Sequence, residues 1–286
     1  ANSNYWDLYH PPADPGDRGW YSKNPEWQEE WYDEIKELVD HYRPDLLYTD
    51  GGVPFNNEVG LSQIANFYNV NGGHRGKPQV VYTCKQPSNG RWVQDYERGV
   101  GATISPYPWQ TDTSIGDWYY NKHWKYQPVS WTAHMLVDIV SKNGNLLLNV
   151  VLKPDGTLDE EVETMLHQLA DWTALTGESI YGTRPWLVYG EGPVRARGGA
   201  FRENMAYTAK DIRFTTKGKT LYATALGWPA RLAAARSAAR RARRRWTRRA
   251  ARKRWRLRTD RPFRCCPCKQ STDPLPARRT LGRWGG

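Results

Sequence analysis

The sequence predicts an α/β fold: the C-terminal half of a (β/α)₈-like, TIM-type barrel, then the start of a β-sandwich and a basic tail expected to be disordered. Short apolar strands alternate with amphipathic helices as far as about residue 180, which favours parallel strands joined by crossover helices. About four such strands can be counted, whereas a complete barrel has eight strands in ~250 residues. We therefore expect only the later part of a barrel.

The first element is a surface helix within residues 22–44. Asn24 can cap it, Pro25 suits its first position and apolar residues recur at helical spacing. Residues 45–49 then form a short apolar run that ends at Asp50, as expected of a buried parallel strand. The further expected barrel elements are helices at 60–70, 128–142 and 157–175 and strands at 79–83, near 101–105 and at 145–150.

The last predicted elements differ in kind. Thr157 and Glu160 have the spacing of a capping box at the start of the last helix. Residues 212–216 and 219–225 are β-type runs on either side of a Lys-Gly turn, which predicts a hairpin. We expect three regions: 1–190, the barrel portion; 191–230, the first hairpin of a truncated β-sandwich; and 231–286, an Arg/Ala-rich tail.

The net charge of +11 is the sum of two unlike parts, −7 for residues 1–230 and +18 for residues 231–286. A basic arm that binds nucleic acid is one interpretation of the tail. A shifted reading frame is the other, and we favour it because Arg, Ala, Pro, Gly and Trp all have GC-rich codons. We expect no nucleic-acid partner, and the tail carries no functional argument.

Composition excludes several other classes. No apolar run approaches the roughly 20 residues that a bilayer requires, so no membrane partner is expected. No signal peptide is visible at the start. Three of the four cysteines lie in the tail, in a C-C-P-C spacing that fits neither a zinc site nor a redox pair. We expect no metal and no cofactor.

Two carboxylates stand out where a barrel builds its chemistry. Asp50 follows a strand directly and precedes Gly51, which places it at the carboxyl end of that strand. Glu97 lies in the loop region after the next strand, although it could equally be a surface acid paired with Lys85 or Arg98. Rival second carboxylates are Glu58 and Asp112.

The loops that carry these acids are rich in aromatic side chains. Aromatic rings suit a pocket that stacks on the apolar faces of a sugar while polar groups bind its hydroxyls, although some must be ordinary packing. Two carboxylates among aromatics at the open end of α/β strands indicate glycoside hydrolysis. The aromatic residues concerned are Tyr48, Tyr82, Trp92, Tyr96, Tyr107, Trp109, Trp118, Tyr119 and Tyr120.

From about residue 5 to 228 the chain resembles the α-L-fucosidases of glycoside hydrolase family 29. The run Ser-Lys-Asn-Gly-Asn-Leu at 141–146 is the most specific element. The other matching stretches are Trp20-Tyr21-Ser22 with residues 27–42, Arg43-Pro44-Asp45-Leu46-Leu47-Tyr48-Thr49-Asp50-Gly51, Asp95-Tyr96-Glu97-Arg98-Gly99, Trp109-Gln110-Thr111, the remainder of 140–150, and Ile180-Tyr181-Gly182-Thr183-Arg184-Pro185-Trp186.

The resemblance implies a retaining enzyme acting on a fucosylated oligosaccharide or glycoconjugate. Asp50 takes the nucleophile position and Glu97 the acid/base position. Tyr48, Trp109 and Trp118 fall where the family binds the sugar. The family also suggests a secreted, periplasmic or lysosomal location.

The family's histidine pair for fucose has no match in this chain, whose histidines are His10, His41, His74, His123, His134 and His167. We therefore expect the first barrel strands to be missing and the activity of this chain to be impaired. A carbohydrate-binding protein without turnover is the main alternative, and a nucleic-acid binder is a weaker one.

Overall fold

The computed structural model describes residues 22–75, 79–227 and 265–267, and the described chain divides into two compact units. The expected tail at 231–286 lies outside the described residues except for 265–267. The first unit contains Ala1–Ser114, Lys142–Val150 and Ala196–Glu203, and the second contains Ile115–Ser141, Val151–Arg195 and Asn204–Gly286.

The first unit is built on a five-stranded parallel sheet whose strands neighbour one another in chain order, β1-β2-β3-β4-β5. Sequential parallel pairing of this kind is the topology of a barrel wall, so the partial barrel predicted from the sequence is confirmed. The strands are β1 (Leu46–Thr49), β2 (Val81–Cys84), β3 (Val93–Asp95), β4 (Trp109–Ser114) and β5 (Gly144–Asn149).

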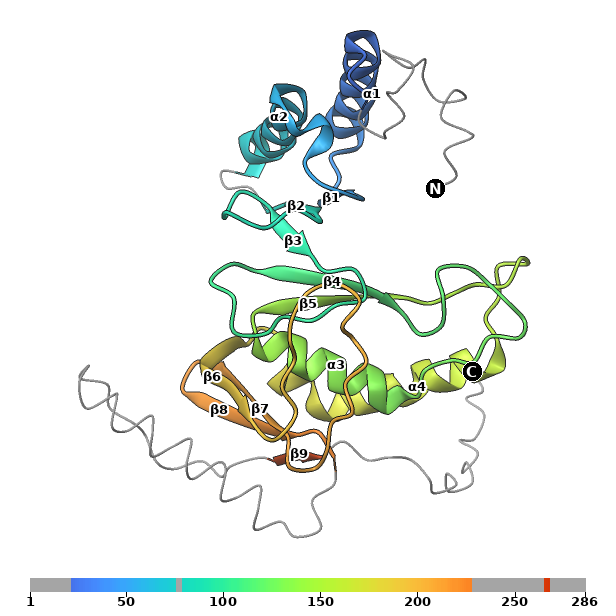
Figure 1. The fold of residues 1–286 in the computed structure, drawn as a ribbon, viewed down its shortest axis with the longest axis vertical. Coiled ribbons are helices and arrows are strands. Elements are labelled where there is room, and N and C mark those ends of the chain that lie inside the picture. Colours follow the sequence, from blue (N-terminus) through green and yellow to red (C-terminus); the bar gives the residue numbers. More distant parts are fainter. Residues whose placement is uncertain (1–21, 76–78, 228–264, 268–286) are drawn as a thin grey trace, which may run out of the picture. The chain divides into compact units, whose positions relative to one another are not determined.

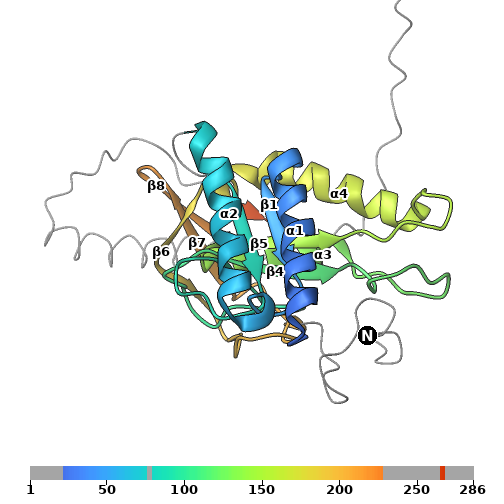
Figure 2. The ribbon, with the colours of Figure 1, turned by 90° about the horizontal axis from the view of Figure 1, so that it is seen from above.

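Two helices, α1 (Pro25–Tyr42) and α2 (Glu58–Arg75), lie side by side next to the β1 and β2 end of this sheet (Figures 1 and 2). The Asn24 side chain accepts a hydrogen bond from the Glu26 amide at 3.0 Å, as predicted for the cap of α1. Their buried faces enclose a core with the strand residues. Its main members are Val39, Val53, Ile64, Phe67, Val80, Tyr82, Cys84 and Trp92.

The predicted end of α2 was wrong, because the helix continues through Gly72 instead of stopping at Val70. Asn71, which would ordinarily favour a turn, turns its amide back to the helix and donates to the Phe67 carbonyl at 2.9 Å. The side chain thereby supports the helix it was expected to end.

The strand predicted near residues 101–105 was also wrong, and β3 and β4 form instead on either side of it. A fully buried Lys142 donates from Nζ to the Gly101 carbonyl at 2.8 Å, and its own carbonyl accepts from the Ser105 amide. The side chain and the carbonyl of Lys142 therefore form hydrogen bonds with backbone groups of Gly101 and Ser105 that a neighbouring strand would otherwise supply.

The second unit contains α3 (Val129–Ser141), α4 (Glu160–Thr176) and a four-stranded sheet in the order β6-β7-β8-β9 (Figure 1). The predicted hairpin is confirmed as β7 (Ile212–Lys217) and β8 (Thr220–Ala225). Next to β7 lies β6 (Arg184–Glu191), which pairs with it in antiparallel fashion. The short β9 (Cys265–Pro267) pairs in parallel with β8, so this part of the tail is a strand where we expected disorder.

The capping box predicted at Thr157 does not form. The helix α4 begins at Glu160 behind Asp159, and the Thr157 hydroxyl donates to Asp155 Oδ1 at 2.7 Å within the preceding turn. The hydroxyl that was expected to cap the helix is already used in that turn. Among the described residues no helix is long and apolar enough to cross a membrane.

Candidate active site

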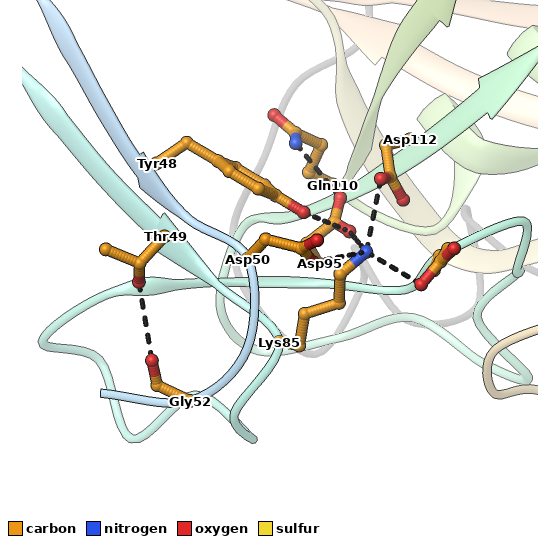
Figure 3. A network of polar contacts seen from close by, with 9 residues as sticks. Tyr48, Thr49, Asp50, Gly52, Lys85, Asp95, Gln110 and Asp112 are labelled. Atoms are coloured by element: carbon orange, nitrogen blue, oxygen red, sulfur yellow. Dashed lines mark hydrogen bonds and ion pairs between the residues drawn. The ribbon is translucent and has the colours of Figure 1, made fainter. Parts of the chain in front are cut away.

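Lys85, which directly follows β2, gathers four carboxylates around one nitrogen in the first unit (Figure 3). Its Nζ lies 3.1 Å from Asp112, 3.2 Å from Glu97, 3.3 Å from Asp95 and 3.6 Å from Asp50. Asp50 follows β1, Asp95 and Glu97 come from β3 and the loop after it, and Asp112 lies in β4. This arrangement brings both predicted catalytic acids into one site.

The separation of Asp50 from Glu97 is bounded by their shared neighbour. Asp50 Oδ1 and Glu97 Oε2 lie 3.6 and 3.2 Å from Lys85 Nζ, so they are at most the sum of these distances apart, about 6.8 Å. Retaining glycosidases hold their two carboxyl groups ~5 to 5.5 Å apart and inverting ones ~6.5 to 9.5 Å. The bound includes the whole retaining range and only the lowest part of the inverting range.

Asp50 is held out from the sheet by the backbone that follows it. Gly51 adopts φ 131°, a value that favours glycine, and its carbonyl accepts a hydrogen bond from the Lys85 amide at 2.6 Å. The Thr49 hydroxyl contacts both the Tyr82 hydroxyl, at 2.6 Å, and the Gly52 carbonyl. The side chain of Asp50 is 82% exposed. A rigid turn thus presents an accessible carboxylate.

Asp95 is the buried member of the cluster. Its carboxylate is fully buried and accepts hydrogen bonds from Gln110 Nε2 at 2.9 Å and from the Tyr48 hydroxyl at 3.3 Å. Burial, followed by the hydrogen bond and negative charge of the neighbouring Asp112, raises its pKa to about 7. Asp95 therefore keeps its proton to a higher pH than an ordinary aspartate does.

Lys85 supplies the compensating positive charge. Burial alone lowers its pKa, but the hydrogen bond with Tyr48 and the carboxylate of Asp112 outweigh this effect and raise the pKa above its usual range. The ammonium group also lies 5.9 Å from the centre of the Tyr48 ring, within cation–π range. Burial raises the pKa of Tyr48 as well, so its hydroxyl remains a donor.

The raised pKa of Asp95 makes a prediction about stability. The folded state binds this proton more tightly than the unfolded chain, whose aspartate has the ordinary value of 3.8. The contribution of Asp95 to the free energy of unfolding is therefore greatest below about pH 4, falls as the pH rises towards 7 and levels off above it. Asp95→Asn should remove this part of the pH dependence, measured by urea unfolding between pH 4.5 and 8. An unchanged profile in the variant would contradict the assignment.

The remaining predicted acids lie at different places in the first unit. Glu97 forms an ion pair with Lys85, one of the two partners expected if it were a surface acid. Lys85 is, however, the centre of the acid cluster, so this pairing places Glu97 in the site. Asp112 joins the same cluster and is less exposed than Glu97, at 16% against 29%. Glu58 is the exposed first residue of α2.

The predicted aromatic residues lie in different surroundings. Tyr48 joins the acid cluster through its contact with Asp95. Trp109 is 2% exposed, packs edge-on against Tyr96 and donates from its indole to the Lys142 carbonyl at 3.0 Å. Trp118 belongs to the second unit and is 41% exposed. The sugar-binding roles of these three residues stay predictions.

Sequence reasoning considered Lys85 only as a partner for Glu97 and missed Asp95 and Gln110. Lys85 follows its strand as directly as Asp50 follows the previous one, so the same rule applied to every strand end would have found it. Within the described residues, no cluster of side chains suits a metal ion.

Comparison with known proteins identifies the family of this chain. The family model described as Alpha-L-fucosidase matches residues 2–178. The plasma alpha-L-fucosidase of Homo sapiens is 29% identical over 213 residues, which covers 68% of this chain and 41% of that protein. The chain thus spans about two fifths of the length of the curated relatives it matches.

Solved structures agree in fold. The Thermotoga maritima alpha-fucosidase in complex with fucose matches 79% of this chain and 49% of its own chain, with a TM-score of 0.58 and 28% identity. Alpha-L-fucosidase isoenzyme 1 from Paenibacillus thiaminolyticus, at 20% identity and a TM-score of 0.53, supports the fold alone. Since the family model matches more than half of the residues, the chain belongs to the α-L-fucosidase family of glycoside hydrolases.

Proposed function

We propose that this protein is a retaining α-L-fucosidase that removes terminal α-L-fucose from oligosaccharides or glycoconjugates. The observation that carries the proposal is the shared contact of Asp50 and Glu97 with Lys85, which keeps two carboxylates from the ends of β1 and β3 within reach of one sugar. Family membership and the fucose bound to the T. maritima relative support the choice of sugar.

In the first step an Asp50 carboxylate oxygen attacks the anomeric carbon of fucose. The bond from that carbon to the leaving oxygen breaks, and the Glu97 carboxyl group gives its proton to that oxygen. The products are the free aglycone and a fucosyl ester of Asp50. The exposure of Asp50 leaves its carboxylate open to the substrate.

In the second step Glu97, now a carboxylate, takes a proton from water as the water oxygen attacks the same carbon. The ester bond breaks, and Asp50 regains its carboxylate. Two displacements at one carbon give fucose with the α configuration of the substrate. The Lys85 ammonium group lies 3.6 Å from Asp50 Oδ1, next to the carboxylate that attacks in the first step and departs in the second.

The choice of Glu97 over Asp112 as the acid/base rests on exposure. Both carboxylates contact Lys85 at nearly the same distance, but Asp112 is the less exposed and interacts with the buried Asp95, whose pKa it raises. A proton donor must reach the leaving oxygen, and Glu97 is the more accessible of the two.

Replacing Glu97 tests both the role and the mechanism. We expect Glu97→Ala to lower kcat/KM for a fucoside with a poor leaving group by about 10²- to 10⁴-fold, since that is what general acid catalysis contributes. A fucoside with a good leaving group needs no acid, so its first step should be nearly unaffected. Added azide should then restore turnover and give α-fucosyl azide, identified by proton NMR.

Asp112→Asn is the matched comparison, because Asp112 is the rival carboxylate of the same cluster. If azide rescues Asp112→Asn and fails to rescue Glu97→Ala, Asp112 takes the acid/base role. If the unmodified chain binds fucose and hydrolyses no aryl fucoside, the carbohydrate-binding alternative replaces the enzyme.

A further inference from the structure

The loop that carries Glu97 is held from two sides, and one side comes from a segment about 100 residues later. Residues 196–203, here called the strap, belong to the same compact unit as the sheet. On the sheet side, the Tyr96 and Arg98 amides donate to the carbonyls of Gln110 and Asp112 on β4. The strap lies along the other side.

Backbone hydrogen bonds fasten the strap to this loop. The Phe201 amide donates to the carbonyl of Glu97 itself at 2.8 Å, and the amides of Arg202 and Glu203 both donate to the Arg98 carbonyl. Val100 and Gly199 exchange a further pair. The Glu97 backbone is thus bonded directly to the strap.

The two backbones approach so closely that a side chain could not be placed between them. A Cβ added to Gly99 would lie 2.5 Å from the Gly199 carbonyl oxygen, well inside contact distance. The close approach of the strap therefore requires glycine at this position.

Arg98 adopts a backbone conformation that needs support. Residues 96 to 99 form a turn, closed by the Gly99 amide donating to the Tyr96 carbonyl at 3.0 Å, and Arg98 has φ 44° at its third position. Such positions favour Gly or Asn, and another residue stays there only when its surroundings fix it. The turn that presents Glu97 is therefore strained.

Glu203 supplies that support with its side chain. Its carboxylate accepts from Arg98 Nη1 at 3.3 Å through one oxygen and from the Thr113 hydroxyl at 2.5 Å through the other. The side chain of Glu203 is 9% exposed. It ties the strained arginine to β4, and neither contact involves the acid cluster.

We infer that Glu203 is a positioning residue for Glu97: through Arg98 and Thr113 it locks the turn that aims the acid/base carboxylate. The inference rests on the proposed role of Glu97, and it adds a buried carboxylate that acts at a distance. A displacement of about 1 Å can lower a rate by ~10²-fold, so the loss of this lock has a measurable effect.

The test compares substrates that differ in their need for a proton donor to the leaving oxygen in the first step. For Glu203→Ala we expect kcat/KM for a fucoside with a poor leaving group to fall about 10- to 100-fold, with less than a twofold change for one with a good leaving group. Glu203→Gln keeps the size and a hydrogen bond to Thr113 and should recover most of the loss. Arg202→Ala is the matched control, because its exposed side chain neighbours the same strap bonds.

Amide hydrogen exchange gives a readout that does not require turnover. Glu203→Ala should speed exchange in the peptide spanning residues 96–101, and Arg202→Ala should leave it unchanged. If the unmodified chain hydrolyses no fucoside, the proposed function fails while exchange still tests the lock. If a Glu203→Ala chain does not fold, Thr113→Val removes the other contact and must show the same pattern.

A uniform loss of rate with both leaving groups, or unchanged exchange in residues 96–101, would overturn the inference. A uniform loss means fewer correctly folded molecules and says nothing specific about proton transfer. The selective loss is the signature of a misplaced acid.

Discussion

Asp50→Gly abolishes hydrolysis if the proposed mechanism is correct, with a loss on the order of 10⁴-fold or more in kcat, because no other group can form the covalent intermediate. The variant should still fold. Asp50 is 82% exposed, and the turn after it is held by backbone contacts of Gly51 and by the Thr49 hydroxyl. Initial rates on an aryl α-L-fucoside measure the loss.

The product formed with azide distinguishes Asp50→Gly from Glu97→Ala. In Asp50→Gly the anion can occupy the space of the missing carboxylate, attack the anomeric carbon from that face and displace a good leaving group, giving β-fucosyl azide. The Glu97→Ala variant should give the α anomer.

Glu58→Gln is the matched control for Asp50→Gly. Glu58 is an exposed acid of the same unit, at the start of α2, and its replacement should leave the rate within about twofold. Full activity in Asp50→Gly would exclude Asp50 as the nucleophile. Loss of both hydrolysis and fucose binding would mean that Asp50 serves binding.

The site was predictable where chemistry follows local pattern. Asp50 was found because an apolar run ends there before two glycines, and the structure places it at the end of β1. Glu97 could be preferred over the rival carboxylates Glu58 and Asp112 only through the family resemblance. Lys85 obeys the same strand-end rule as Asp50, but it was read as a surface partner because a single basic residue suggests no chemistry by itself.

Contacts between segments that are distant in the sequence could not be predicted from local patterns. Trp109 was assigned to the sugar from the family resemblance, and nothing in its local sequence indicated that its indole donates to the Lys142 carbonyl 33 residues later. In place of the strand expected near 101–105, the chain bonds to the buried Lys142, whose polar neighbours Ser141 and Asn143 gave no sign of this role. Glu203 lies 90 residues from Thr113, so nothing in either local pattern indicated their contact.

The second unit depends on a buried ion pair between α3 and β7. Arg213 Nε lies 2.5 Å from Asp138 Oδ1, with side chains 2% and 0% exposed. The guanidinium also lies over the rings of Tyr189 and Tyr207, at 5.4 and 5.2 Å from their centres. Desolvation makes such a pair costly to break, because the remaining charge stays in a poorly hydrated site.

Arg213→Met should therefore destabilise this unit by about 3 to 5 kcal/mol, since it leaves the Asp138 carboxylate without its arginine. Urea unfolding measures the change in the free energy of unfolding, and hydrogen exchange in peptides of α3 and β7 locates it. Arg184→Met, an exposed arginine of the same sheet, is the control and should cost less than about 0.5 kcal/mol.

The double variant Arg213→Met/Asp138→Leu separates charge from packing. Replacing both partners of a buried pair with apolar groups is often neutral or stabilising, so the double variant should recover most of the loss. Failure to recover would show that Arg213 contributes mainly by stacking on Tyr189 and Tyr207. Because hydrolysis is assigned to acids of the first unit, this loss of stability should lower the amount of folded protein without changing the leaving-group dependence of the rate.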